Sequence, residues 1–167
     1  MKECRPYFFD DDGTIPNNPS LPLLVYPGVL ESAEGDPGAV KRLLGRHKWK
    51  GAWVNGIYSY PHYHSTAHEV LVVTGGSAEV QFGGTQGEQM QLGAGDAVVI
   101  PAGVGHCRIS SSPGFQVVGA YPEGQSWDLC TGRSGERSRI LKNIRSVPLP
   151  ERDPLSGERE PLLGYWE

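Results

Sequence analysis

The chain has 167 residues, about the length of one domain, and its 23 glycines and 14 prolines are many for that length. Frequent glycine and proline favour short strands joined by turns, so the composition favours an all-β fold. The formal net charge of −4 provides no basic surface for nucleic acid, and apolar runs such as VLVV and AVVI are too short to span a membrane.

The cysteines and the N-terminus bear on the compartment. The three cysteines, Cys4, Cys107 and Cys130, are odd in number and lack C-x-x-C spacing. The stretch MKECRPYFFDDD has no long apolar segment of the kind found in secretory signals. We therefore expect a soluble protein with reduced thiols in the cytoplasm.

The stretch FFDDDGT contains D-x-D-G-T at residues 10–14, the pattern of phosphatases of the haloacid dehalogenase superfamily. Those enzymes need the first aspartate at the end of a buried parallel strand, followed by alternating helices and strands. Here Pro6 precedes the stretch, and short strands come after it. We interpret the stretch as a surface turn, in which Asp10 or Asp12 accepts backbone hydrogen bonds and Gly13 supplies a positive φ. A phosphatase is the weaker alternative.

Two elements are predicted before residue 49. Residues 17–30, NNPSLPLLVYPGVL, carry three prolines around a short apolar core, which favours an extended edge strand. A helix then begins after Asp36, which can cap it, with Pro37 in the first turn, and runs to about His47. Its apolar stripe, which should pack on a sheet, consists of Val40, Leu43 and Leu44.

From Trp49 to about Asp128 the apolar pattern shortens into runs of strand length separated by glycine. The runs are AWVNGIYSY, EVLVVTG, AEVQFGG, EQMQLGAG, DAVVIPAG, HCRISSS and FQVVGAYP. This pattern predicts an antiparallel meander that forms the core of the protein.

The C-terminal part changes character again. Residues 131–147 contain five basic residues and one acidic residue, with Ile140, Leu141 and Ile144 at helical spacing, which predicts a short amphipathic helix. The apolar end of the tail, which includes Leu162 and Trp166, should dock on its own barrel or on a neighbouring subunit, with disorder up to about residue 160 as the alternative. We divide the single domain into an N-terminal extension (1–48), a barrel core (49–128) and a C-terminal helix and arm (129–167).

Four polar residues carry the strongest chemical signal. His62 and His64 are two residues apart, so on a strand both imidazoles project from one face. Glu69 opens the following apolar run, and His106 opens a later strand after a glycine turn. Three nitrogens and one oxygen suit Fe, Mn, Ni, Cu or Zn, and the residues do not choose among these metals. The alternative is a set of hydrogen-bonded polar residues around a vestigial site.

The spacing of these residues resembles the two motifs of the cupin superfamily. The first motif, G-x5-H-x-H-x3/4-E-x6-G, fits without a gap, and the second, G-x5-P-x-G-x2-H-x3-N, fits until Ser110 replaces the asparagine. The matching positions are Gly56, His62, His64, Glu69, Gly76, Gly95, Pro101, Gly103 and His106. The segments FFDDDGTIPNNP, NGIYSYPHYHSTAHEVL, VVGAYPEGQSWDL and DPLSG also resemble the small bacterial YjlB-like cupins.

The resemblance implies a double-stranded β-helix, or jelly-roll barrel, with one divalent transition metal inside, and commonly a homodimer. It also implies two functional hypotheses. The first is a metal-dependent oxygenase or isomerase acting on a small organic substrate, with Glu69 as a ligand or as a base. The second is a non-enzymic small-molecule sensor or binding protein with a structural metal. Room beside the ion would favour the first, and a barrel filled by side chains would favour the second.

Strand alternation extends the predicted site. If His62 and His64 face inward, so do Tyr58 and Tyr60, unless Pro61 bulges the strand; if His106 faces inward, so does Arg108. We hypothesise that Arg108 and one or both of these tyrosines line the mouth of the barrel and hold a carboxylate or phosphate of the ligand near the metal. The alternative is an internal salt bridge, or a bulge that turns Arg108 to solvent.

Four further residues are expected to play no direct part in the site. His68 has the opposite strand parity from Glu69 and should face away from the metal. Cys107 should point into apolar packing, and Trp127 should lie in the core rather than form a platform for a ligand. His47 is interpreted as a charge at the end of the first helix.

Overall fold

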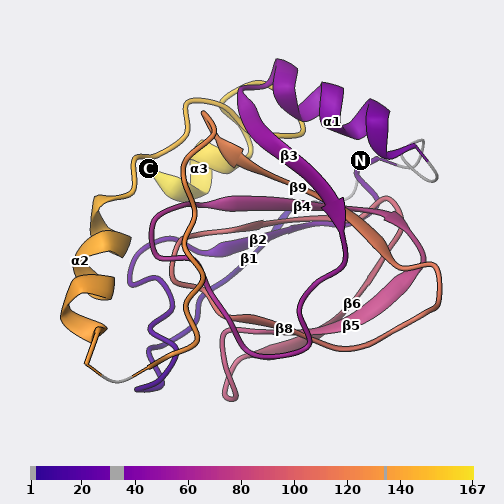
Figure 1. Cartoon of the computed structure of the whole chain (residues 1–167). Helices are drawn as coiled ribbons and strands as arrows, with labels where there is room; N and C mark the ends of the chain where they lie inside the picture. Colours follow the sequence, from indigo (N-terminus) through magenta and orange to yellow (C-terminus); the bar gives the residue numbers. More distant parts are fainter. Residues whose placement is uncertain (1–2, 31–35, 134) are drawn as a thin grey trace.

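The structure is a computed structural model that describes residues 3–30, 36–133 and 135–167. Its strands pair antiparallel into two facing sheets (Figure 1). The larger sheet has the order β1 (Arg5–Tyr7), β2 (Leu23–Tyr26), β7 (Ala97–Ile100), β4 (Glu69–Gly75), β9 (Gln116–Pro122) and β3 (Trp49–Asn55). The smaller sheet has the order β6 (Glu88–Gly93), β5 (Ser77–Phe82) and β8 (His106–Ser111). This arrangement confirms the predicted all-β jelly-roll fold.

Alternation along the strands of the larger sheet builds two apolar layers. In β4, Leu71 and Val73 belong to the cluster between the sheets, whereas Val70 and Val72 belong to a second cluster on the outer face. The helices α1 (Pro37–Arg46) and α3 (Leu162–Trp166) cover that outer face (Figure 1). The larger sheet is therefore buried on both sides, which explains why its central strands read as continuous apolar runs.

The strand predicted at the edge of the sheet lies inside it. β2 pairs with β1 on one side and β7 on the other, and all four of its residues are buried. The three prolines of the segment flank the strand, so they remove none of its ladder hydrogen bonds. The outermost strand on this side is β1, in the stretch before the predicted turn.

The predicted first helix is confirmed. α1 begins after Asp36, whose side chain accepts a hydrogen bond from the Ala39 backbone N–H at 3.0 Å, and Pro37 occupies the first turn. Its buried residues, Val40 and Leu44, join the outer apolar cluster.

The apolar tail docks on its own barrel. Leu162, Leu163 and Trp166 are buried in the outer cluster, and Trp166 Nε1 donates to the Pro22 carbonyl at 2.9 Å. The buried Asp153 holds the arm by accepting hydrogen bonds from the Tyr26 hydroxyl at 2.7 Å and from the backbone N–H of Leu162 at 3.1 Å. The apolar end of the tail is thus buried against its own chain and gives no support to a dimer. The prediction of a dimer now rests only on the resemblance to the cupin superfamily.

The second amphipathic helix is also confirmed. α2 (Arg137–Ser146) buries Ile140 and Ile144 in a small cluster with Ile15, Tyr63 and Cys130. Among the residues placed in the structure, no helix is both long enough and apolar enough to cross a lipid bilayer.

The opening acidic stretch forms a turn. Asp12 Oδ1 accepts from the backbone N–H groups of Thr14 and Ile15 at 2.8 and 2.7 Å, and Gly13 has a φ of 90°. The prediction for Asp12 is confirmed, whereas the carboxylate that binds the Gly13 N–H belongs to Asp11 rather than Asp10. The strands after this stretch pair antiparallel, whereas the phosphatase alternative requires a parallel sheet built from alternating strands and helices.

Candidate metal centre

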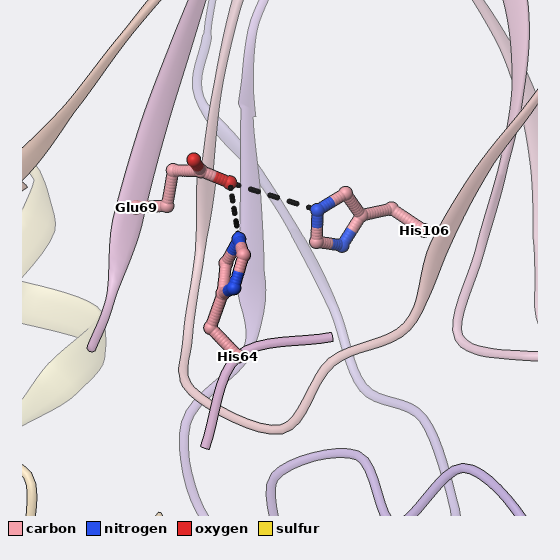
Figure 2. Close-up of side chains that lie close together, drawn as sticks. All are labelled: His64, Glu69 and His106. Atoms are coloured by element: carbon pink, nitrogen blue, oxygen red, sulfur yellow. Dashed lines mark ion pairs between the residues drawn. The ribbon is translucent and has the colours of Figure 1, made fainter. Parts of the chain in front are cut away.

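Three of the four predicted ligands meet at one point inside the barrel. His64 Nε2 and His106 Nε2 each lie 3.6 Å from the same oxygen, Oε1 of Glu69 (Figure 2). The three ligand atoms all lie within 4.8 Å of one another, and all three side chains are buried. The site is therefore a small polar cluster in an otherwise apolar interior.

The elements that carry these residues differ in regularity. Glu69 is the first residue of β4 and shares the inward parity of Leu71, while His106 is the first residue of β8. The segment before β4 was expected to be a strand, but β3 ends at Asn55, and only isolated bridges join His62 to His106 and Tyr63 to Cys130.

The predicted alternation nevertheless holds along this irregular segment. His62 and His64 line the cavity, and Tyr63 between them packs against α2. The two imidazoles therefore reach one side of the segment without a regular strand to carry them.

A glycine turn connects His106 to His64. The Gly103 N–H donates to the His64 carbonyl at 2.8 Å, and Gly103 has a φ of 93°. A Cβ at this position would lie 2.5 Å from the Asn17 carbonyl oxygen, so the turn requires glycine. The buried Asn17 side chain also accepts from the Gly105 N–H at 3.1 Å. The N-terminal segment thereby fixes the turn that places His106.

The Nδ1 atoms of the site histidines all face backbone carbonyls. Nδ1 of His62 lies 2.9 Å from the Tyr60 oxygen, Nδ1 of His106 lies 3.1 Å from the Val104 oxygen, and Nδ1 of His64 bonds the Asp128 oxygen. A carbonyl only accepts, so each Nδ1 is a donor, and in the neutral ring Nε2 carries the lone pair. The arrangement leaves the Nε2 atoms of His64 and His106 facing Glu69 inside the barrel.

The charges in the cluster support each other. Burial alone would raise the pKa of Glu69, but in the metal-free protein its ion pairs with the protonated imidazoles of His106 and His64 outweigh burial and lower the pKa below the ordinary value. Burial would lower the pKa of His64, and the contact with Glu69 raises it instead. Burial, aided by the nearby His106, lowers the pKa of His62 to about 3. The cluster thus combines an ionised carboxylate with a neutral His62.

The donor set fits a transition metal. A deprotonated Nε2 and a carboxylate oxygen both present lone pairs, so a cation between them relieves their repulsion. Two donors bound to one ion at ~2.1 Å lie roughly 3 to 3.5 Å apart, close to the 3.6 Å separations found here. The backbone carbonyls behind the rings are the partners that orient metal-binding histidines. His62 stands outside the group of three, with its ring centroid 4.0 Å from that of His106.

A cavity of about 580 Å³ opens beside the cluster, within the range of small-molecule sites. Tyr121 and Trp53 contribute to its wall, with the Trp53 Nε1–H donating to the Tyr121 hydroxyl at 2.8 Å. Burial and the adjacent Glu69 raise the pKa of Tyr121 above its ordinary value. Neither aromatic residue was predicted for the site, although in the run FQVVGAYP Tyr121 has the inward parity of Val117.

The predicted substrate-binding residues divide between two cavities. Tyr58 and Arg108 line the main cavity, whereas Tyr60 lines a second cavity of about 410 Å³. The two tyrosines stack at 5.0 Å on the irregular segment and are half-exposed, at 49% and 41%. Because the chain leaves the sheet after Asn55, they do not share one inward-facing strand.

Of the four residues expected outside the site, His47, His68 and Cys107 do not line the main cavity, whereas Trp127 does. His68 is fully buried on the outer side, with its ring 4.8 Å from that of Trp166. Cys107 is buried, and burial raises its pKa. The prediction for Trp127 is wrong, because this residue is 49% exposed and lines the main cavity, 5.4 Å from the His64 ring. His47 lies at the end of α1, where its Nδ1 is 2.6 Å from the Pro154 carbonyl.

Comparisons with known proteins agree on one family. The family model described as Cupin matches residues 54–124. The chain is 48% identical over 165 residues to the uncharacterized protein YjlB of Bacillus subtilis (strain 168), covering 99% of this chain and 98% of that protein.

Two solved structures are more distant. WlaRB TDP-quinovose 3,4-ketoisomerase from Campylobacter jejuni aligns with a TM-score of 0.43 at 14% identity, over 56% of this chain and 75% of that one. An 11S globulin from Wrightia tinctoria aligns with a TM-score of 0.40 at 20% identity, over 47% of this chain and 21% of that one.

Proposed function

The chain belongs to the cupin family, together with YjlB of Bacillus subtilis, and on that premise we propose that it binds one divalent transition metal and presents it to a small organic ligand. The observation that carries the proposal is the pair of Nε2 atoms, from His64 and His106, each 3.6 Å from one oxygen of Glu69. A backbone carbonyl that faces Nδ1 fixes the orientation of each of these two imidazoles. His62 is the proposed fourth ligand, because its ring borders the cluster and its Nδ1 faces a carbonyl in the same way.

The proposed reaction is of the oxygenase or isomerase type. A divalent ion with three or four protein ligands retains open positions and supplies Lewis acidity or oxygen activation to a ligand bound beside it. The cavity of about 580 Å³ provides room for that ligand, which favours chemistry over a purely structural ion.

Glu69 is better suited to ligation than to general base catalysis. An effective base at neutral pH needs a pKa near 7, whereas the ion pairs with His106 and His64 lower the pKa of Glu69 despite its burial. A carboxylate that remains ionised is a strong oxygen ligand and a weak base. We therefore assign Glu69 to the metal and leave the movement of protons to the ligand and to the polar groups around it.

The test is the metal content of protein purified without a histidine tag, measured by elemental mass spectrometry. We expect about one equivalent of a transition metal in the parent and little in a His64→Ala/His106→Ala double variant. A His47→Gln variant, which removes an imidazole at the end of α1, is the matched control and should retain the metal.

Single variants sharpen the ligand assignment. His62→Ala should weaken metal binding if His62 is the fourth ligand and should leave it unchanged if three ligands suffice. A parent protein that contains no metal, even after incubation with iron, manganese, nickel, copper and zinc salts, would refute the proposed function.

A further inference from the structure

We propose that the ligand of this cavity carries an oxyanion, a carboxylate or a phosphate, on a flat apolar body, with Arg108 holding the oxyanion and Trp127 stacking on the body. The inference rests on the proposed function in one respect, because the metal is taken to bind the other end of the same ligand. It adds the chemical class of that ligand and the two residues that recognise it.

Arg108 is held in place by neutral partners. Its Nε donates to the Ile57 carbonyl at 3.0 Å, and one terminal nitrogen donates to the Ser111 hydroxyl at 3.1 Å. Among the residues that the structure describes, Arg108 forms no ion pair, and its second terminal nitrogen makes no hydrogen bond. A guanidinium has five N–H donors, so several of them remain for a ligand. The side chain is therefore oriented in advance, with its charge uncompensated.

The charges around Arg108 also favour an anionic ligand. Of the described residues that line the cavity, Glu69 is the only one with a carboxylate, and His64 and His106 already flank it. A divalent ion at the cluster would leave the cavity with a net positive charge of about two, counting Arg108. An anionic ligand that reaches both groups neutralises this charge in a partly desolvated site, where such pairing is strong.

The spacing along β8 fits a small ligand. His106 and Arg108 are two residues apart on one strand, so their Cα atoms are separated by roughly 6.6 Å and their side chains share a face. Both residues line the cavity. One molecule of about the size of a benzene ring with a substituent can therefore contact the guanidinium while a donor atom reaches the cluster.

The flat body is inferred from Trp127. This indole lines the cavity yet is 49% exposed, and it packs edge-on against His64 and nearly parallel to Tyr121, at 6.3 Å and 23°. An exposed indole at the mouth of a cavity offers a large apolar surface at low conformational cost. A planar ligand stacked there would be held close to the histidine that carries the proposed metal.

The experiment is calorimetric titration with four probes, in which benzoate is compared with each of the other three. Benzoate and benzyl alcohol differ in the charge, whereas benzoate and acetate differ in the flat body; phenyl phosphate replaces the carboxylate by a phosphate. We expect benzoate to bind at least about tenfold more tightly than either benzyl alcohol or acetate. Whichever of benzoate and phenyl phosphate binds more tightly identifies the oxyanion.

The variants assign the binding to residues. Arg108→Gln should weaken benzoate binding by at least about tenfold without changing that of benzyl alcohol, and Trp127→Ala should reduce the preference for benzoate over acetate. Arg46→Gln, which removes an equal charge from the exposed end of α1, should bind like the parent. If Arg108→Gln fails to fold, Arg108→Lys replaces it, because lysine keeps the charge but loses the planar fork and should still weaken binding.

Metal content, measured on every sample, separates the two proposals. Equal benzoate affinity in Arg108→Gln and Arg46→Gln would overturn the inference, as would a metal-containing parent that binds none of the anions. If the parent contains no metal but binds benzoate through Arg108, the proposed function fails and the oxyanion site stands.

Discussion

His68 and Glu69 are neighbours in the chain and reach opposite sides of the same sheet. Glu69 points into the barrel, where two imidazoles hold its charge and a cavity opens beside it. His68 points outward into the layer formed with α3, where its Nδ1 accepts from the Ala102 N–H at 2.9 Å and its Nε2 has no hydrogen-bond partner among the described residues. Both side chains are buried, yet only one has partners that stabilise a charge.

The difference shows that partners, rather than burial, decide whether an ionised group persists. Burial disfavours the charge of both residues. For Glu69 the ion pairs with His106 and His64 more than compensate, and its pKa falls below the ordinary value. For His68 nothing compensates, and burial lowers the pKa to about 3. The two imidazoles beside Glu69 therefore stabilise a charge at that position, whereas no described residue does so for His68.

The largest expected effect comes from placing a charge on the outer side. His68→Glu puts a carboxylate next to Trp166 with no cationic partner, so we expect the free energy of unfolding to fall by about 3 to 5 kcal/mol. Urea denaturation followed by fluorescence measures the loss. Ile109→Glu, at an exposed position, is the control and should change the stability by less than about 0.5 kcal/mol. Equal losses in the two variants would show that the outer layer admits water.

On the inner side, protons and metal should compete for the same nitrogens. Imidazole binds a metal only when Nε2 is deprotonated, and the contact with Glu69 raises the pKa of His64 above its ordinary value of 6.5. The affinity for Zn²⁺ should therefore fall as the pH drops through this raised pKa, by up to about tenfold per pH unit for each proton displaced. Competition titration with a chelator between pH 8 and pH 5 measures it, and a flat affinity would argue against histidine ligation.

On the outer side, the lowered pKa of His68 makes stability depend on pH. The folded-state pKa of about 3 lies below the ordinary 6.5, so the contribution of His68 is complete above pH 6.5 and is lost as the pH falls toward 3. The loss is at most about 1.4 kcal/mol per pH unit. His62 acts in the same direction and His64 in the opposite one.

The contribution of His68 is isolated by comparison with His68→Gln, in which Oε1 can replace Nδ1 as the acceptor for Ala102. The unfolding free energy of this variant should decline less between pH 6.5 and 4 than that of the parent. Parallel pH profiles would mean that His68 is not held neutral.

A smaller effect on stability than that of His68→Glu is expected at Glu69. Glu69→Gln keeps the shape but removes a charge that its two imidazole partners stabilise more than burial disfavours it, so the metal-free protein should lose about 1 to 3 kcal/mol of unfolding free energy. Metal binding should be severely weakened in the same variant. A large loss of stability in the metal-free protein would mean that the cluster is structural.

Much of the architecture was accessible from the sequence because it depends on local rules. Strand alternation placed Glu69 inward and His68 outward, and the cap at Asp36 fixed the start of α1. The motif spacing identified the residues that meet at the cluster, since the turn before His106 requires a glycine at position 103.

Other features escaped prediction because they depend on which segments meet in space. The prolines around β2 indicated an edge strand, but β1 pairs beyond it. Trp127 has no local signal that separates a core indole from one at a cavity mouth, and only the packing of residues 53, 121 and 127 around the cluster puts it there. Tyr58 and Tyr60 line different cavities because the backbone leaves the sheet after Asn55.

The sequence by itself determined the barrel, the family and the polar residues at its centre, because strand periodicity, turn glycines and motif spacing are properties of short segments. The tertiary structure decided which groups surround those residues: the carbonyls that fix each imidazole, the uncompensated charge of Arg108 and the exposed face of Trp127. These depend on contacts between segments distant in the chain, and it is these contacts that set charge and desolvation at the site.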